Sequence, residues 1–71
     1  MAYDTAETIR AWLRDNPGFH FTDDLLEGCV ARNPNHTRSQ YRVSLYQLER
    51  SKNSVVESGG SSDTRKWRYR Q

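Results

Sequence analysis

The chain has 71 residues, of which only 34% are hydrophobic and 28% are charged. In so short a chain, hydrophobic burial barely exceeds the conformational entropy lost on folding, so we expect one small domain without a large internal substrate cavity. The single cysteine, Cys29, excludes an intramolecular disulfide, and no apolar run approaches the length of a membrane span. These features favour a cytoplasmic protein.

Charge is distributed unevenly along the chain, although the total is only +2. Residues 1–30 contain six acidic residues against two arginines, a net charge of −4. Residues 31–71 contain nine basic residues against three acidic ones, a net charge of +6. Basic residues often do no more than hydrate a surface, but their segregation into one half favours a partner made of phosphate.

The first helix is expected from Asp4 to about Asp15, because Asp4 and Glu7 have the spacing of a capping box. Its buried face should contain Ala6, Ile9 and Leu13, with Trp12 at the margin. The turn residues 16–18 end this helix. Residues 19–21, Phe-His-Phe, then alternate as a very short strand, and we expect both phenyl rings to turn inward.

A second helix is predicted after Thr22, which we expect to cap it. Its first turn carries Asp23 and Asp24, which are favourably placed near the positive end of the helix dipole. The apolar stripe consists of Leu25, Leu26, Cys29 and Val30. Residues 33–34, Asn-Pro, end the helix and leave only a short turn before the next one.

The third helix, over residues 37–52, has a clear start signal, because Thr37 and Gln40 have capping-box spacing. At about 100° per residue, one face carries Tyr41, Leu45 and Leu48. The opposite side and its flanks carry hydrogen-bonding groups and one β-branched residue: Ser39, Gln40, Arg42, Val43, Tyr46, Gln47 and Arg50. We therefore expect one side to be anchored in the core and the other to be able to read nucleic acid.

After residue 52 the pattern changes from helical to alternating. Val55-Val56 begins a strand, residues 58–63 form a polar glycine-serine connection, and residues 65–70 alternate bases with aromatic residues. Trp67 and Tyr69 are expected to face the core against the third helix, with Lys66, Arg68 and Arg70 on the other side of the strand. The two strands should form a hairpin with a long loop.

In this order of elements the chain resembles the winged helix-turn-helix family, and the resemblance covers nearly all of it. It is carried by Thr22-Asp23-Asp24-Leu25-Leu26, by the short turn of residues 33–36, by Tyr41-x3-Leu45-x2-Leu48-Glu49 and by Val55-Val56-Glu57. The resemblance implies an α+β fold, a small winged helix with three helices, a short first strand and a C-terminal β-hairpin wing. In that family the helix matching residues 37–52 usually lies in the major groove, while the hairpin tip reaches the adjacent backbone or minor groove.

Two positions depart from the family pattern. Asn53 and Ser54 stand where family members often have a glycine before the second strand, and the turn between the motif helices contains Pro34. The proline implies that the angle between these helices differs from the usual one.

We therefore predict a small, sequence-specific double-stranded DNA-binding protein, either a transcriptional regulator or an architectural factor of the excisionase kind. The predicted contacts are Arg38, Ser39, Gln40, Arg42, Val43, Tyr46, Gln47 and Arg50 on the helix, and Arg65, Lys66, Arg68 and Arg70 on the hairpin. Arg42 is suited to a bidentate guanine contact, whereas the basic residues of the hairpin would contact the DNA backbone without reading sequence. So short a module would need a homodimer or a cooperating protein to bind specifically.

Simpler interpretations remain open for these residues. The arginines could merely hydrate a helix or protect a terminal strand edge, and Val43 could pack under the wing. The same fold could also serve as an adaptor for an acidic protein, such as a subunit of the transcription machinery, through the acidic first half, Tyr3 and an exposed Ala11 flank of the first helix. RNA binding through Trp67 and Tyr69 is a weaker alternative.

The sequence predicts no catalytic, metal or cofactor site. His20, Cys29 and His36 match no zinc spacing, and Asp23 and Asp24 would point about 100° apart on a helix, which prevents them from acting as a dyad. Residues 59–60 are followed by Ser-Ser-Asp rather than by the lysine and hydroxyl of a P-loop. We expect no enzymatic activity, no cofactor, no small-molecule ligand and no membrane partner.

Overall fold

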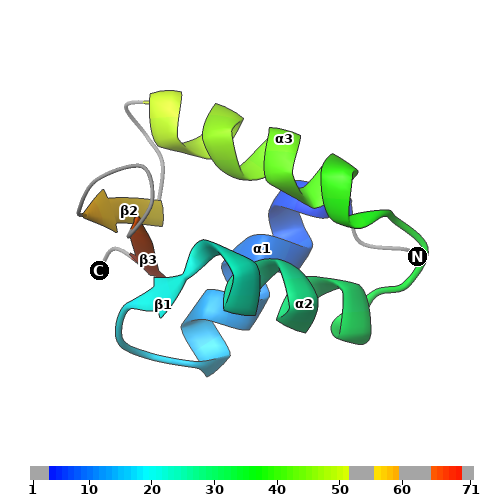
Figure 1. Ribbon diagram of the computed structural model, residues 1–71, viewed down its shortest axis with the longest axis horizontal. Coiled ribbons are helices and arrows are strands. Elements are labelled where there is room, and N and C mark those ends of the chain that lie inside the picture. The colour runs from blue at the N-terminus through cyan, green and yellow to red at the C-terminus, as the bar shows by residue number, and fades with distance from the viewer. Residues whose placement is uncertain (1–3, 52–55, 60–64, 70–71) are drawn as a thin grey trace.

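Three helices and a small antiparallel sheet make up the computed structural model, which describes residues 4–51, 56–59 and 65–69 (Figure 1). The elements in chain order are α1 (Thr5–Asp15), β1 (His20–Phe21), α2 (Thr22–Arg32), α3 (Arg38–Arg50), β2 (Val56–Gly59) and β3 (Lys66–Tyr69). The predicted α+β class and the predicted order of elements are confirmed.

Local capping chemistry begins α1 and α3 where the sequence predicts. Asp4 Oδ1 accepts a hydrogen bond from the Glu7 amide at 2.7 Å. Thr37 and Gln40 form a complete capping box, in which Thr37 Oγ1 accepts from the Gln40 amide at 3.2 Å and Gln40 Oε1 accepts from the Thr37 amide at 2.7 Å. The end of α3 differs from the prediction, because the helix stops at Arg50 and Ser51 is already extended.

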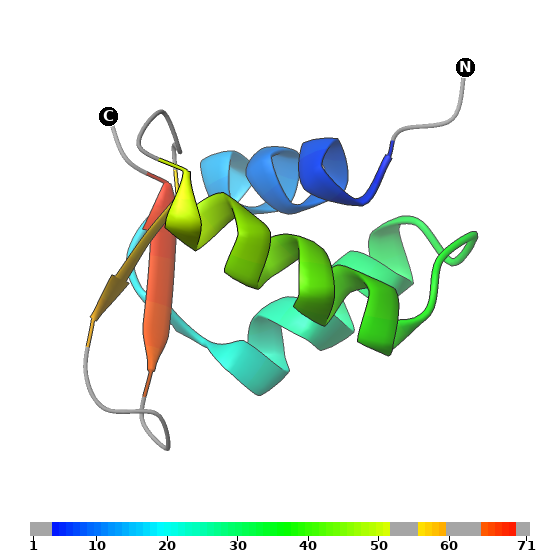
Figure 2. The same ribbon diagram turned by 90° about the horizontal axis from the view of Figure 1, so that it is seen from above.

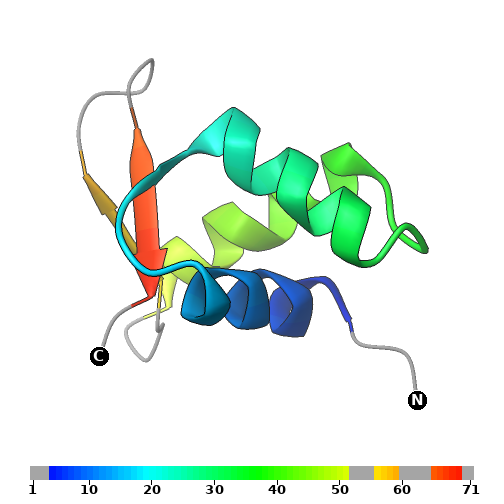
Figure 3. The same ribbon diagram turned by 90° about the horizontal axis from the view of Figure 1, so that it is seen from below.

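The predicted role of Thr22 as a cap is wrong. Phe21 is the N-cap residue of α2 and makes no side-chain capping bond, while Thr22 is the first residue inside the helix. Thr22 Oγ1 accepts a hydrogen bond from Trp67 Nε1 at 2.8 Å and donates to the Arg65 carbonyl at 3.4 Å. Figure 3 shows that β1 lies beside β3 and leads directly into α2. The Thr22 hydroxyl is therefore held against the start of the C-terminal strand instead of the helix end.

The sheet has the strand order β1-β3-β2, with both pairs antiparallel. Ser58 pairs with Trp67 and Gly59 with Lys66, so these two residues belong to β2 and not to the connection that the sequence predicts from residue 58. Pairing with β3 supplies backbone hydrogen bonds that small residues satisfy as well as any others. The connection over residues 60–64, together with Tyr3, Lys52, Asn53, Ser54, Val55 and Arg70, lies outside the described residues.

One hydrophobic cluster joins all three helices to β3. Its members are at most 1% exposed: Ile9, Leu13, Leu25, Leu26, Cys29, Tyr41, Leu45 and Trp67. Full burial of such a side chain contributes about 1.5–3 kcal/mol. The anchored side of α3 is thereby confirmed, although Leu48 is only partly buried, as are Trp12, Val30, Tyr46 and Tyr69. In the part of the chain described here, no helix has both the length and the apolar character needed to cross a bilayer.

More of α1 is covered than its apolar pattern indicates. Ala11, expected on an exposed flank, is only 8% exposed, and Thr8 is 1% exposed. The reason is that α1 contacts α2, α3 and β3, so neighbouring elements cover several of its sides. Thr8 Oγ1 donates to the Asp4 carbonyl at 2.9 Å and accepts from Asn33 Nδ2 at 3.2 Å, which satisfies the buried hydroxyl.

Helices α1 and α2 approach each other closely where Trp12 lies over Gly28. A methyl group added to Gly28 would overlap the indole ring of Trp12. Glycine costs helix stability, yet this position of α2 requires it, because no larger residue leaves room for the ring. Trp12 in turn packs its ring against His20, with the centroids 4.8 Å apart.

The predicted inward orientation of the two phenyl rings is wrong. Phe19 is 47% and Phe21 is 48% exposed, whereas His20 faces the core side, where its Nε2 donates to the Asn16 carbonyl at 2.6 Å. His20 pairs with Trp67, which is fully buried. The side chains alternate as predicted, but the two faces are exchanged: the rings point outward and His20 points inward. A shift of one residue in strand pairing moves every side chain to the other face.

Candidate nucleic-acid interface

A strip of exposed side chains runs along the side of α3 that is turned away from Tyr41 and Leu45. Figure 2 shows that α3 lies in front of the other helices, with this side uncovered by the rest of the described chain. Six of the predicted contact residues are exposed on it, and we call them the α3 face: Ser39, Gln40, Arg42, Val43, Gln47 and Arg50. Val43 does not pack under the wing, since it is 58% exposed.

Arg42 is the central cation of the α3 face. Its guanidinium carbon lies 5.8 Å from the centroid of the Tyr46 ring, which supports the side chain along the helix. It lines two shallow hollows, one along α3 with Val43 and Gln47, and one between α3, the start of α2 and β3 with Thr22 and Arg65. The Arg42 side chain therefore borders both hollows, the one along α3 and the one towards the sheet.

Arg38, another predicted contact, is joined to the acidic residues of α2. Its guanidinium lies 2.5 Å from Asp23 Oδ1 and 3.8 Å from Glu27 Oε1. The side chain of Arg38 is 48% exposed, and those of its partners are 81% and 72% exposed. Ion pairs exposed to this extent contribute at most about 1 kcal/mol, so a phosphate could replace the carboxylates at little cost.

Arg65 and Tyr46 support the structure more than they face solvent. Arg65 Nη1 donates to Glu49 Oε1 at 3.1 Å, and both side chains are less than a third exposed. The Arg65 guanidinium carbon also lies 5.5 Å from the centroid of the Tyr46 ring and 5.7 Å from that of Trp67. Tyr46 packs edge-on against Trp67. Arg65 thus fastens the end of α3 to β3.

The other described basic residues of the hairpin, Lys66 and Arg68, lie on a different surface from the α3 face. Lys66 and Arg68 are exposed, while Trp67 between them is buried, as the alternating pattern predicts. The Lys66 ammonium lies 5.0 Å from the centroid of the Phe21 ring, and the Arg68 guanidinium carbon lies 5.1 Å from that of Phe19. We call these four residues the outer face of the sheet. Sequence reasoning missed its two phenylalanines, because no local signal sets the phase of a two-residue strand.

The three residues considered as metal ligands each pack in a separate environment. His20 lies against Trp12, Cys29 is in the core and His36 lies edge-on to Tyr41. Burial raises the pKa of the Cys29 thiol to about 12. The side chain therefore stays protonated at neutral pH and acts as a small apolar residue.

Comparisons with protein-family models, with curated proteins and with solved structures found no match to this chain. The geometry and chemistry of its own surfaces therefore provide the basis for a functional proposal. Two surfaces combine cations with other exposed groups: the α3 face, which adds mainly polar side chains, and the outer face of the sheet, which adds two phenyl rings.

Proposed function

We propose that the chain is a small winged helix domain that binds double-stranded DNA, with the α3 face in the major groove. The observation that supports this most directly is the division of α3 into a side buried through Tyr41 and Leu45 and a side of six exposed, mainly polar residues. The hairpin that follows α3 and pairs with β1 is consistent with the winged helix arrangement.

The α3 face has the dimensions and the chemistry of a groove-reading helix. The 13 residues of α3 make a helix about 20 Å long, and the major groove is about 12 Å wide, enough for one helix. Arg42 is suited to guanine O6 and N7, Gln47 to adenine, and the exposed Val43 to a thymine methyl group. Ser39 and Arg50, near the two ends of the helix, suit contacts to flanking phosphates.

Arg38 and Arg65 take different roles in this proposal. Arg38 would exchange its exposed partners Asp23 and Glu27 for a backbone phosphate. Arg65 would act as a positioning residue, because its bond to Glu49 fixes the hairpin relative to the end of α3. The proposed contact set therefore centres on the α3 face and Arg38.

The test is fluorescence anisotropy of a labelled duplex of about 20 base pairs, two helical turns, across a salt series. We expect the logarithm of the binding constant to fall linearly with the logarithm of salt concentration, and Arg42→Ala to weaken binding and reduce that slope by about one. Arg32→Ala is the matched control, because it removes the same charge from the end of α2, where Arg32 pairs with Asp15 at 2.7 Å.

Absence of duplex binding at low salt, or equal losses in Arg42→Ala and Arg32→Ala, would contradict the proposal. Both variants should keep the thermal midpoint of the parent protein, since both side chains are exposed. Capture of an acidic protein that persists after nuclease treatment and in an Arg38→Ala/Arg42→Ala variant would favour the adaptor instead. The burial of Ala11 already removes one surface expected to serve that role.

A further inference from the structure

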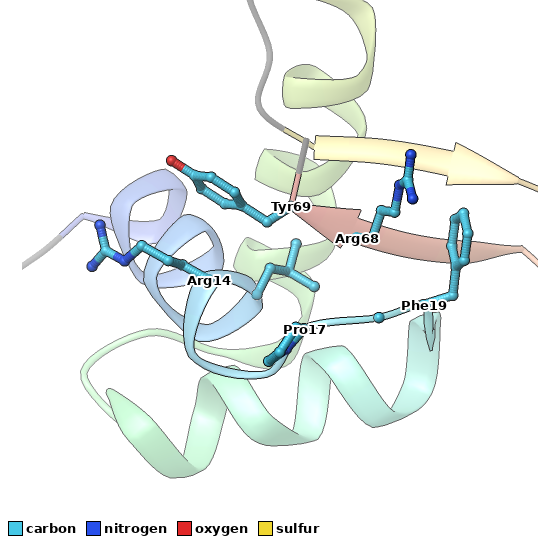
Figure 4. A pocket seen from close by; sticks show the side chains of 7 residues that line it. Arg14, Pro17, Phe19, Arg68 and Tyr69 are labelled. Atoms are coloured by element: carbon cyan, nitrogen blue, oxygen red, sulfur yellow. The ribbon is translucent and has the colours of Figure 1, made fainter. Parts of the chain in front are cut away.

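The outer face of the sheet arranges rings and cations in two matched rows. Phe21 pairs with Lys66 across β1 and β3, and the same antiparallel register, continued by two residues, brings Phe19 opposite Arg68. Each ring is contacted by the cation of its own row, at 5.0 Å for Lys66 and 5.1 Å for Arg68. Figure 4 shows Arg68 extending alongside the ring of Phe19.

Both phenylalanines of the chain lie on this face, and each keeps nearly half of its surface exposed despite the neighbouring cation. A solvent-exposed cation–π contact is weak. It therefore stabilises the orientation of each ring without removing it from water. A ligand that covers the rings would gain the burial that the fold itself leaves unused.

A third cation adjoins this face through a hollow of about 360 Å³. The hollow begins beside Phe19 and Arg68, runs over Pro17 and Gly18, and ends at Arg14 and Tyr69 (Figure 4). Arg14 is exposed. The surface thus presents cation and ring in succession from Lys66 and Phe21 to Arg68 and Phe19, and Arg14 adds a cation at the far end of the hollow.

We propose that the outer face of the sheet binds a short segment of single-stranded nucleic acid, with bases stacked on Phe19 and Phe21 and phosphates at Lys66, Arg68 and Arg14. A single strand alternates flat rings with negative charges, as this surface alternates flat rings with positive ones. Side chains two residues apart along a strand are separated by about 6.6 Å, which is twice the rise of roughly 3.4 Å between stacked bases. The two rings therefore suit unstacked, extended nucleotides, which a duplex does not offer.

This proposal does not depend on duplex binding, because it uses none of the residues of the α3 face. Stacking and phosphate contacts are common to DNA and RNA, so the ligand class is single-stranded nucleic acid in general. Parallel measurements with oligothymidylate and oligouridylate, each about ten nucleotides long, distinguish the two sources.

The test is fluorescence anisotropy of these labelled oligonucleotides with the full chain at low salt. We expect Phe19→Ala and Phe21→Ala each to weaken binding about 5- to 150-fold, the range for losing one base–aromatic stack. Arg14→Ala should reduce the salt slope by about 0.7, the value for one phosphate of a single strand. The duplex affinity of all three variants should remain that of the parent protein.

Conservative substitutions separate stacking from simple apolar docking. Phe21→Leu keeps the apolar character but loses the ring, whereas Phe21→Tyr keeps the ring. Stacking predicts that Phe21→Leu binds as weakly as Phe21→Ala and that Phe21→Tyr binds like the parent. Far-UV circular dichroism would detect an alanine variant that fails to fold. Phe21→Leu and Phe21→Tyr change the size of the side chain little, so they distinguish stacking from apolar contact even in that case.

Three outcomes would overturn the proposal: no binding of either oligonucleotide at low salt, unchanged binding in the alanine variants, or parental affinity in Phe21→Leu. The last result would show that apolar contact, and not stacking on the ring, holds the oligonucleotide. Arg42→Ala is the reciprocal control, because it should impair duplex binding and leave oligonucleotide binding intact. Failure of either proposal can therefore be recognised separately.

Discussion

The buried polar groups around the turn between α2 and α3 are hydrogen-bonded to one another. Tyr41 Oη donates to the Asn33 carbonyl at 2.6 Å, and the Asn33 side chain donates to Thr8. Burial raises the pKa of Tyr41, so the phenol remains a hydrogen-bond donor well above neutral pH. An unmatched group here would cost about 1–3 kcal/mol, a large fraction of the stability of so small a domain.

Cys29 makes the fold less stable at alkaline pH. Its pKa is raised from 9.0 to about 12 by burial, so above pH 9 the unfolded thiol loses its proton while the folded one keeps it. The unfolded state then binds fewer protons, and the free energy of unfolding decreases as pH rises from 9 towards 12, by up to about 1.4 kcal/mol per pH unit. Below pH 9 this contribution is fully present.

Urea unfolding at a series of pH values between about 8 and 10 measures this decrease, and a variant without the thiol accounts for the tyrosines, which begin to ionise in the same range. Cys29→Ala is the control, because it lacks the thiol but retains every other titrating group. We expect a shallower decrease in the variant. Equal slopes in the two proteins would show that the thiol of the folded state is accessible to ionisation.

At the scale of elements, the sheet is joined to the helices by a few polar contacts between residues far apart in sequence. Thr22 connects the start of α2 to Trp67 and Arg65 of the C-terminal segment. Arg65 connects that segment to Glu49 of α3. These two contacts set the position of β3, and through it the outer face of the sheet.

Thr22→Val should lower the free energy of unfolding by about 1–3 kcal/mol. Valine has nearly the same shape but cannot accept the hydrogen bond from Trp67 Nε1, which leaves a buried donor unsatisfied. Thr22→Ser keeps the hydroxyl and should retain most of the stability. Urea unfolding of the three proteins makes the comparison, and a loss in Thr22→Ser as large as that in Thr22→Val would show that the hydrogen bond to Trp67 is not the source of the stability.

At the scale of the whole molecule, one cluster contains residues of every helix and of β3. Trp67 belongs to it together with Leu45 of α3 and Leu26 of α2, and it is fully buried. No separate core supports the sheet within the described residues. The helices and the sheet should therefore unfold as one cooperative unit.

Urea unfolding followed by two probes tests this cooperativity. Far-UV circular dichroism reports the helices, and fluorescence reports Trp67 in a Trp12→Phe variant, where it is the remaining tryptophan. We expect the same midpoint and the same slope from both probes. An earlier transition in fluorescence would mean that the sheet separates from a persisting helical unit.

The sequence by itself determined the features that rest on chemistry within a few residues. The capping box of Thr37 and Gln40, the cap at Asp4 and the division of α3 into an apolar and a polar side all follow from spacing along one helix. The alternation that buries Trp67 and exposes Lys66 and Arg68 is local in the same sense. These features were predicted correctly.

Only the tertiary structure decided how the N-terminal segment meets β3. The orientation of Phe19 and Phe21, the use of the Thr22 hydroxyl and the inclusion of Ser58 and Gly59 in β2 all depend on pairing with residues 66–69. A two-residue strand has no preferred phase of its own, so its partner, more than 40 positions away, sets it. The physical reason is that backbone pairing and the burial of Trp67 are properties of the assembled sheet, which no short stretch of sequence contains.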